Sequence, residues 1–512
     1  MGEAIDPQDA VFKFLGDPAT YGGREVRRID THAAAVFLAG DRALKIKRAV
    51  RFPFLDFSTL PKRKAACLGE LEVNRAFAPE LYRRVVPITR NASGQISLGG
   101  EGEPIEWAVE MRRFDESQTL DHLADAHGVD ETLADKLAVA VATMHAQAPV
   151  VEANPWLDAV AQFLDQNTAA FGEMPELFPG ELVAQLDRAS RVALDRLRPL
   201  LLARGRQGFC RRGHGDLHLG NIVLLKGQPV PFDALEFDPV IASGDVLYDL
   251  AFLLMDLLER RLDRAANIVL NRYFAVAHRP EDLDGLAALP FFMSLRAAIR
   301  AKVTAARLAN AATTARPAIA KAAHAYFRLA VDLIAPPRPV LVAIGGLSGT
   351  GKSVLARSLA PFIAPAPGAL VLRSDVERKQ LFGLAETERL PPDTYSKETS
   401  ARVYEMVTDK AARTVAAGHS AIVDAVFAQA DERAAIAAMA ASQNVSFRGL
   451  FLVADLKTRI ERVGSRSLDA SDADAAVARR QEAFRIGRVD WTEIDASGSP
   501  ADTLARARTA MD

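Results

Sequence analysis

The sequence contains very little cysteine and no long apolar segment, and both absences narrow the class of protein. Two cysteines, Cys67 and Cys210, occur among 512 residues. They are too few for a disulfide framework and favour a reducing cytoplasm. The N-terminus has no basic region followed by an apolar stretch, so no signal peptide is expected. The longest apolar stretch near the middle, residues 250–255, is far too short to span a bilayer, so no membrane partner is expected.

A strong excess of charge of one sign is also lacking. The formal net charge is −2, and no basic patch interleaved with aromatic residues is visible. This balance disfavours nucleic acid and acidic membranes as obligate partners. The hydrophobic content of 49% and the charged content of 25% are those of a globular protein.

A proline-rich segment at residues 335–339, Ala-Pro-Pro-Arg-Pro, is the clearest domain boundary. A chain of 512 residues is too long for one ordinary core, so two or three domains are expected. Proline fixes φ and cannot join a helix interior, which makes this segment a stiff linker. The sequence therefore predicts one domain at residues 1–334, a linker at 335–339 and a second domain at 340–512.

The motif with the most specific chemistry is the segment 345–353, GGLSGTGKS. It fits G-x-x-x-x-G-K-[ST], and it lies between an apolar run at 339–344 and a helical pattern at 354–360. This order turns backbone N–H groups and a helix N-terminus toward a phosphate, although a glycine-rich turn that binds nothing is the alternative. The predicted ATP-binding residues are Gly346, Leu347, Ser348, Gly349, Thr350, Gly351, Lys352, Ser353 and Val354.

Two side chains of this loop carry the expected chemistry. Lys352 is predicted to reach the β/γ-phosphates and to act in catalysis, and Ser353 is predicted to ligate Mg²⁺. The pattern that follows alternates strands and helices, as in a parallel α/β sheet.

Polar residues also follow two of the predicted strands in this region. Asp375 comes directly after a strand at 369–373, at the carboxyl edge where ligands bind in such sheets, and Arg378 lies one helical turn further on. Asp424 ends the next strand and could hold Mg²⁺ through water. Arg466 belongs to a set of arginines near a possible lid over the phosphates, although each arginine of the set could equally be a surface residue.

The N-terminal portion contains a predicted hairpin at residues 35–47. On its second strand, Lys45 and Lys47 face one side while Leu44 and Ile46 face the other. From these residues alone, a solvated sheet edge is the favoured interpretation of the two lysines. A helical pattern at 61–77 follows and carries Glu70.

A second chemical segment begins at residue 214 with HGDLHLGN and returns through a short hairpin to Asp233. Hard Mg²⁺ prefers oxygen ligands, and Asn221 and Asp233 could supply them. Asp216 would then accept a proton from a substrate hydroxyl. A polar turn capped by its own Asx side chains is the alternative.

The C-terminal domain resembles P-loop kinases of the small-molecule, zeta-toxin and polynucleotide-kinase type. The resemblance covers about residues 340–481, and it depends on the P-loop and on the segments 373–378 and 423–427. It implies that Asp375 contacts or deprotonates the substrate hydroxyl and that Arg378 helps to hold the substrate. An arginine one turn from an aspartate is expected to keep that aspartate ionised.

The N-terminal domain resembles the aminoglycoside phosphotransferase and choline-kinase branch of the protein-kinase-like fold, through residues 214–221 and Asp233. The resemblance implies that Lys45 or Lys47 is the lysine that binds ATP phosphates. The A-x-K spacing favours Lys45, and Glu70 would be its partner. Asp249 would brace the catalytic loop. No glycine-rich lid precedes these lysines, and Leu219 replaces the usual proline of the loop.

Together these features predict a two-domain protein of mixed α/β and α+β class. The chain as a whole resembles a bacterial fusion of a bilobal, protein-kinase-like phosphotransferase domain with a P-loop parallel sheet flanked by helices. The predicted function is ATP- and Mg²⁺-dependent transfer of the γ-phosphoryl group to a small hydroxylated acceptor, with a kinase-like site in each domain. An ATP-binding sensor with a degenerate kinase-like domain is one alternative, and a nucleic-acid end kinase is another. The sequence does not predict the acceptor or the oligomeric state.

Overall fold

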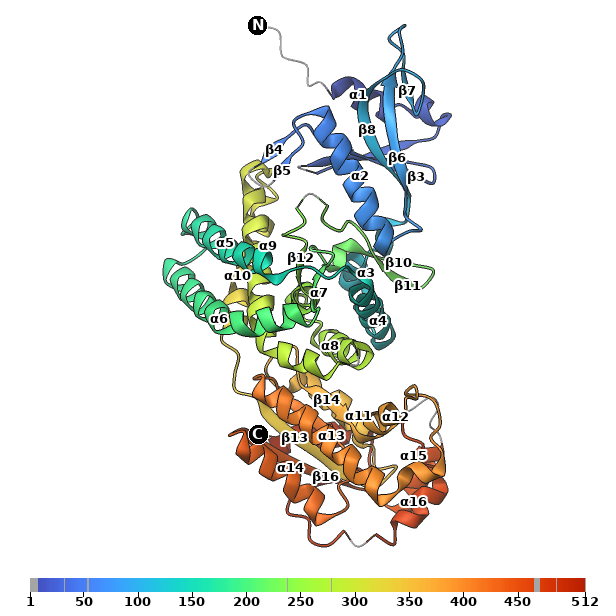
Figure 1. Ribbon diagram of the computed structural model, residues 1–512, viewed down its shortest axis with the longest axis vertical. Helices are drawn as coiled ribbons and strands as arrows, with labels where there is room; N and C mark the ends of the chain where they lie inside the picture. The colour runs from blue at the N-terminus through green and yellow to red at the C-terminus, as the bar shows by residue number, and fades with distance from the viewer. Residues whose placement is uncertain are drawn as a thin grey trace. The chain divides into compact units, whose positions relative to one another are not determined.

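The computed structural model describes residues 8–31, 33–52, 55–236, 238–277, 279–464, 470–484 and 486–511. The chain divides into two compact units (Figure 1). The first unit comprises residues 1–162 and 201–256, and the second comprises residues 163–200 and 257–512. The first contains an antiparallel sheet and the second a parallel sheet, which confirms the predicted fold class.

The first unit is built on a six-stranded antiparallel sheet. The strand order is β1 (Val26–Asp30), β2 (Ala34–Ala39), β3 (Arg42–Lys47), β8 (Glu103–Arg112), β6 (Tyr82–Arg90) and β7 (Ile96–Leu98). The predicted hairpin at 35–47 is confirmed as β2 and β3, whose register pairs Val36 with Lys45. The strand β1 was not predicted, because three of its five residues are charged and apolar and polar residues do not alternate regularly along it.

Both faces of this sheet are covered. Leu44 and Ile46 pack in an apolar cluster with α1 (Asp9–Gly16) on one face. Ala43 packs with Cys67 of α2 (Leu60–Phe77) on the other, and Figure 1 shows α2 lying along the sheet. Because side chains alternate along a strand, the lysines of β3 point toward α2 rather than toward solvent.

The rest of the first unit surrounds two short antiparallel pairs. These are β10 (Ile222–Leu225) with β11 (Gln228–Pro231), and β9 (Cys210–Arg212) with β12 (Ser243–Asp245). A small hairpin joins β4 (Arg51–Phe52) to β5 (Leu55–Asp56). The helices of this region are α3 (Leu120–His127), α4 (Glu131–Gln147) and α7 (Val246–Glu259), with parts of α5 (Ala153–Gly172) and α6 (Gly180–Arg206).

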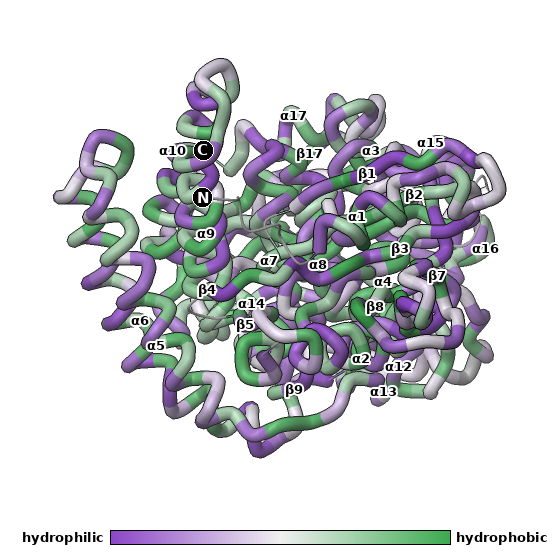
Figure 2. Tube along the Cα trace, turned by 90° about the horizontal axis from the view of Figure 1, so that it is seen from above, coloured by the Kyte–Doolittle hydropathy of each residue, from purple (hydrophilic) through white to green (hydrophobic). Residues whose placement is uncertain are grey.

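The apolar stretch at residues 250–255 forms the buried middle of α7. Its residues Leu250 and Met255 have no exposed surface, so α7 is a core helix. The helices α5 and α6 differ from α7, because apolar and polar residues alternate along them (Figure 2). Such alternation is typical of helices with one apolar side. Across the described ranges, no helix combines the length and hydropathy needed to cross a membrane.

The second unit contains a five-stranded parallel sheet. Its order is β14 (Leu370–Arg373), β15 (Ala421–Asp424), β13 (Val340–Gly346), β16 (Ser446–Val453) and β17 (Thr492–Asp495). The strand predicted at 369–373 and the strand predicted to end at Asp424 are confirmed as β14 and β15. The strand β17 was not predicted, because Ile494 is its one buried residue.

Helices flank this parallel sheet on both faces. Figure 1 shows α13 and α14 lying across it, and an apolar cluster joins Leu355 of α11 and Ala507 of α17 to Val342 and Ile344 of β13. The helices are α11 (Lys352–Leu359), α12 (Ser374–Leu381), α13 (Lys397–Ala416), α14 (Ala430–Ser442), α15 (Leu456–Gly464), α16 (Ala475–Gln481) and α17 (Pro500–Met511).

Three helices that precede the proline-rich segment also belong to the second unit. They are α8 (Asp263–Ala277), α9 (Leu289–Ala306) and α10 (Arg316–Ile334). Residues 335–339 are coil between α10 and β13, and a domain boundary there stays a prediction.

Two asparagines of α8 complete the edge of the parallel sheet. The side-chain amides of Asn267 and Asn271 each donate to Ala369 O at 3.1 Å, and Val371 N donates to Asn271 Oδ1 at 2.7 Å. An edge strand otherwise exposes unpaired backbone groups. The helix α8 therefore satisfies hydrogen bonds of β14, the strand that leads to Asp375.

Replacing Asn271 with alanine is expected to destabilise this edge by about 1–3 kcal/mol, because the substitution leaves the Val371 amide unpaired. Hydrogen exchange at Val371 should become faster by the corresponding factor. Asn310→Ala, at an exposed position of the same unit, is the control. Unchanged protection at Val371 in Asn271→Ala would show that the asparagine contact does not hold the edge strand.

Candidate active sites

The P-loop joins β13 to α11 through three glycines with positive φ. These are Gly346 at 135°, Gly349 at 88° and Gly351 at 98°. A Cβ on Gly346 would lie 2.6 Å from Leu452 O, and one on Gly349 would lie 2.5 Å from Arg459 O. Glycine is therefore required here both by the backbone conformation and by the close packing of the loop against β16 and α15.

The polar residues of this site meet at the carboxyl edge of the sheet. Lys352 Nζ donates to Leu347 O at 3.3 Å, and Ser353 Oγ accepts from Arg373 Nη2 at 3.2 Å. Arg373 Nε also lies 3.4 Å from Asp424 Oδ2. The two predicted Mg²⁺ ligands, Ser353 and Asp424, are thus joined through one arginine. Sequence reasoning missed Arg373, although it ends the strand next to that of Asp424.

Asp375 occupies the first turn of α12, where burial and charged neighbours act on its carboxyl group. Burial raises the pKa of Asp375, and the carboxylate of Asp424 raises it further, while Arg373 and Lys352 oppose the rise. Arg373 is therefore an arginine whose charge acts on Asp375. That Arg378 keeps this aspartate ionised stays a prediction.

Arg378 is engaged elsewhere in the structure. Its guanidinium donates to Thr394 O at 3.1 Å and to Ser400 Oγ at 3.3 Å, and it lies 4.9 Å from the ring centroid of Tyr395. These contacts hold the guanidinium against residues 394–400. A role for Arg378 in holding the substrate stays a prediction.

Arg466, the predicted lid residue, lies outside the described residues. The neighbouring helices nonetheless hold the backbone of the P-loop. Arg459 Nε donates to Ser348 O at 2.9 Å, and Ser348 N donates to Gln481 Oε1 at 2.7 Å. Arg462 Nη1 donates to Thr350 O at 3.3 Å. Sequence reasoning did not assign these contacts of α15 and α16, and no local signal marks Gln481.

The first unit brings Lys45, Glu70 and Asp233 together. Lys45 Nζ lies 2.8 Å from Glu70 Oε1 and 2.5 Å from Asp233 Oδ1. Burial alone would lower the pKa of Lys45, but the carboxylates of Asp233 and Glu70 outweigh it and raise that pKa well above its usual value. Lys45 is therefore held as an ammonium between two carboxylates from distant parts of the chain.

Lys47 makes a related but distinct set of contacts. It pairs with the same Glu70 and with Glu236, a residue that sequence reasoning missed. The choice of Lys45 as the phosphate-binding lysine stays a prediction, supported by its contact with Asp233.

The second part of the candidate site in this unit is the loop that contains Asp216 and Asn221. Asn221 Nδ2 donates to the backbone oxygen of Asp216 at 3.0 Å and to its Oδ2 at 2.9 Å. His218 Nδ1 accepts from Gly220 N at 3.1 Å, and its Nε2 lies 3.5 Å from Asp216 Oδ2. The loop therefore fixes the carboxylate of Asp216 through side chains of its own.

Two buried carboxylates of the helix α7 accept hydrogen bonds from the backbone of this loop. Asp249 accepts from His214 N at 2.8 Å and from Gly215 N at 3.0 Å, as the family resemblance implies. Asp256 accepts from Leu219 N at 2.9 Å. Sequence reasoning missed Asp256, although a spacing of seven residues places both aspartates on one face of a helix.

Replacing Asp249 with alanine is expected to destabilise the first unit by about 2–4 kcal/mol, because two buried backbone N–H groups lose their acceptor. Hydrogen exchange at His214 and Gly215 and the thermal unfolding midpoint would measure this loss. Glu72→Ala, at an exposed position of α2, is the control. An unchanged midpoint with unchanged exchange would refute the bracing role.

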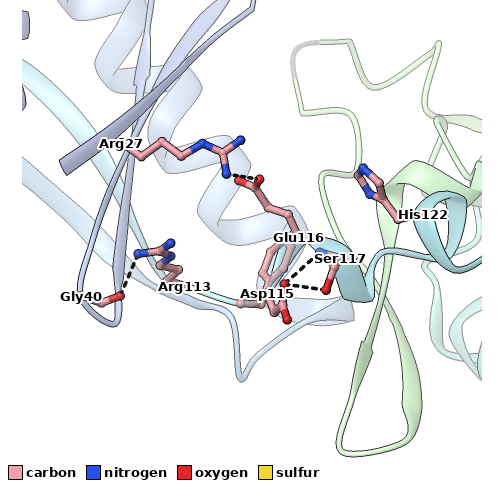
Figure 3. A pocket seen from close by; sticks show the side chains of 8 residues that line it. Arg27, Gly40, Arg113, Asp115, Glu116, Ser117 and His122 are labelled. Atoms are coloured by element: carbon pink, nitrogen blue, oxygen red, sulfur yellow. Dashed lines mark hydrogen bonds and ion pairs between the residues drawn. The ribbon is translucent and has the colours of Figure 1, made fainter. Parts of the chain in front are cut away.

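A hollow of about 560 Å³ lies where β8 continues into the segment at residues 113–117 (Figure 3). Arg27 of β1 reaches across it to Glu116 with an ion pair of 2.9 Å. Asp115 accepts from Ser117 N at 3.0 Å. The ring of Phe114, which also lines the hollow, lies 5.0 Å from that of Phe232, the residue before Asp233. The hollow is therefore linked to the segment of Asp233 through the contact between these two rings.

The first unit thus combines an antiparallel sheet that carries a Lys–Glu pair with an Asp–Asn loop, as in protein-kinase-like phosphotransferases. The second combines a parallel sheet with a P-loop. Residues 26–289, which are 264 of the 512 residues, match the model of the phosphotransferase enzyme family, and the chain belongs to this family. Residues 341–485 match the model of an AAA domain. The chain is therefore an enzyme of the kinase or phosphotransferase type with a nucleotide-binding P-loop domain.

Relatives of similar length span both units. Uncharacterized protein Rv2004c of Mycobacterium tuberculosis and Uncharacterized protein Mb2027c of Mycobacterium bovis are each 28% identical over 491 residues, which cover 93% of this chain and 94% of each relative.

Two solved structures are similar to parts of the chain. A choline/ethanolamine kinase family protein from Mesorhizobium loti is 14% identical, covering 64% of this chain and 99% of that chain, with a TM-score of 0.37. A gluconokinase from Sinorhizobium meliloti is 17% identical, covering 34% and 91%, with a TM-score of 0.25. Similarities at these scores do not define a substrate.

Proposed function

We propose that this protein is an ATP- and Mg²⁺-dependent kinase with two active sites, each of which transfers the γ-phosphoryl group to a hydroxyl of a small molecule. The observation that carries the proposal is the cluster of Lys45, Glu70 and Asp233 in the same unit as the bonded pair Asp216–Asn221. An ion-pair cluster with only a structural role would not need the hydrogen-bonded pair Asp216–Asn221 in the same unit. Two free, buried cysteines support a cytoplasmic location.

In the first site, the donor set suits a hard divalent cation. Asn221 and Asp233 offer amide and carboxylate oxygens, which Mg²⁺ prefers. The carboxylate of Asp233 is 41% exposed, so it is accessible to a ligand. When bound, Mg²⁺ would neutralise charge on the phosphates. Lys45 would bind the phosphates in exchange for Asp233, and Asp216 would accept the hydroxyl proton.

In the second site, the P-loop backbone and Lys352 would bind the phosphates, and Ser353 and Asp424 would hold Mg²⁺. Asp375 would contact the acceptor hydroxyl and take its proton. The raised pKa of Asp375 brings that carboxylate closer to the range in which a base is effective. Arg378 is proposed to help hold the substrate. Arg466 is proposed to belong to a lid that closes over the phosphates.

The experiment that tests this proposal is ADP release from Mg·ATP with a panel of acceptors. The panel contains sugars, aminoglycosides, amino alcohols, nucleosides and 5′-hydroxyl oligonucleotides. Acceptor-dependent ADP release with a small molecule supports the proposal and names its substrate class. Tight ATP binding without any acceptor-dependent release would favour a nucleotide sensor instead. Release with oligonucleotides alone, and with an affinity that falls steeply with salt, would favour a nucleic-acid end kinase.

A further inference from the structure

A second buried ion pair lies beside Lys45 in the first unit. Lys47 Nζ lies 2.6 Å from Glu70 Oε2, and Lys47 also pairs with the carboxylate of Glu236. The side chains of Lys47, Glu70 and Glu236 are 4%, 0% and 6% exposed. One oxygen of Glu70 therefore serves Lys45 and the other serves Lys47, in a place that water hardly reaches.

Lys47 is held in this position from several directions. Gln8 Nε2 donates to its backbone oxygen at 2.8 Å, and its ammonium lies 5.3 Å from the ring centroid of Phe57. Glu236 lies 189 residues further along the chain. The pair is therefore a product of the tertiary fold, and it requires both residues to be in place.

The balance of positive and negative charges around Lys45 explains the role of the Lys47–Glu236 pair. Lys45 and Lys47 carry two positive charges against three negative charges on Glu70, Asp233 and Glu236. If Asp233 turns to a bound cation, two positive and two negative charges remain, and the buried cluster is balanced. Without Lys47, Glu70 and Glu236 would both depend on Lys45, because a buried charge without a partner is costly.

We propose that Lys47 and Glu236 are positioning residues that keep the ammonium of Lys45 available for the phosphates of ATP. Lys47 neutralises one oxygen of Glu70, and Glu236 holds Lys47 in place. Lys45 then exchanges Asp233 for a phosphate without leaving Glu70 unpaired. Neither Lys47 nor Glu236 touches the nucleotide in this arrangement. The inference rests on the proposed function of the first unit.

The test measures the affinity for Mg·ATP by titration calorimetry in a Lys352→Ala background, in which P-loop binding is expected to be weak. Lys47→Met is expected to raise the Kd, and the KM for ATP, at least about tenfold with a smaller change in kcat. The conservative variant Lys47→Arg should keep most of the affinity. Lys62→Met, an exposed lysine of α2, is the matched control.

A double variant separates positioning from simple structural support. The side chain of Asp233 is 41% exposed, so it is left out of the count of buried charges. Lys47→Met and Glu236→Gln singly each leave one buried charge unbalanced and should lower the thermal unfolding midpoint. The double variant removes both charges, so its midpoint should recover, while its Kd for Mg·ATP stays raised because Glu70 still retains Lys45. A double variant with wild-type Kd, or a Lys47→Met protein that loses only stability, overturns the inference.

The two proposals fail in different ways. If no acceptor gives ADP release that depends on Asp216, the proposed function fails, but the Kd values still decide whether Lys47 positions Lys45. If the first unit binds no Mg·ATP at all, both proposals are overturned.

Discussion

Replacing Lys352 with alanine is expected to lower acceptor-dependent ATP turnover by the second unit about 100- to 1000-fold. Lys352 is the first residue of α11 and directly follows the glycines of the P-loop. Phosphoryl transfer is catalysed mainly by positioning and by neutralising charge on the phosphates. Removing one fixed positive charge from a preorganised site typically costs two to three orders of magnitude.

The controls for Lys352→Ala distinguish the loss of this charge from unfolding. Lys457→Ala, at an exposed position of α15, should leave turnover unchanged. Lys352→Arg should not restore turnover, because the planar guanidinium does not fit a site shaped for a compact ammonium. A Lys352→Ala protein with full turnover by the second unit would show that the P-loop is not a catalytic phosphate site.

Replacing Asp216 with asparagine is expected to lower kcat in the first unit about 100- to 10,000-fold, with little change in the KM for ATP. General-base catalysis contributes a factor of this size. An amide keeps the shape of the carboxylate and can still accept from Asn221 Nδ2, which bonds to Asp216 Oδ2 at 2.9 Å. The loop should therefore stay folded while its capacity to take a proton is lost.

The measurement is ADP release with the acceptor that the panel assigns to the first unit. Asp41→Asn, in the turn between β2 and β3, is an exposed control in the same unit. Lys352→Ala should not affect this activity, so the two variants together assign each acceptor to one site. If Asp216→Asn kept wild-type kcat, the first unit would not use this carboxylate as its base.

Local sequence pattern was sufficient for the P-loop and for the alternation of β3. The loop needs glycine at Gly346 and Gly349 for steric reasons that act over a few residues. The alternation of β3 correctly placed Lys45 and Lys47 on the same face of the sheet. The alternation could not show which of the two lysines binds phosphate, because both lysines contact Glu70.

The distinction between the two lysines depends on residues that are far away in the chain. Lys45 contacts Asp233, which lies 188 residues further on, and Lys47 contacts Glu236. Similarly, the helical spacing of Arg378 from Asp375 did not reveal that the guanidinium contacts residues 394–400. Spacing along a helix predicts a shared face, but it does not predict where a long side chain ends.

The sequence by itself determined the two classes of domain, the P-loop motif, the hairpin of β2 and β3 and the strands β14 and β15. Those features follow from short-range rules: the steric freedom of glycine, the alternation of side chains on a strand and the spacing of carboxylates around a loop. Only the tertiary structure decided that Asp256 of α7 also holds the loop of Asp216 and Asn221. It also decided that α8 completes the edge of β14 and that Lys47–Glu236 lies beside Lys45. Those contacts join residues that only the packed fold brings together, because buried charges and unpaired backbone groups must find partners wherever the chain places them.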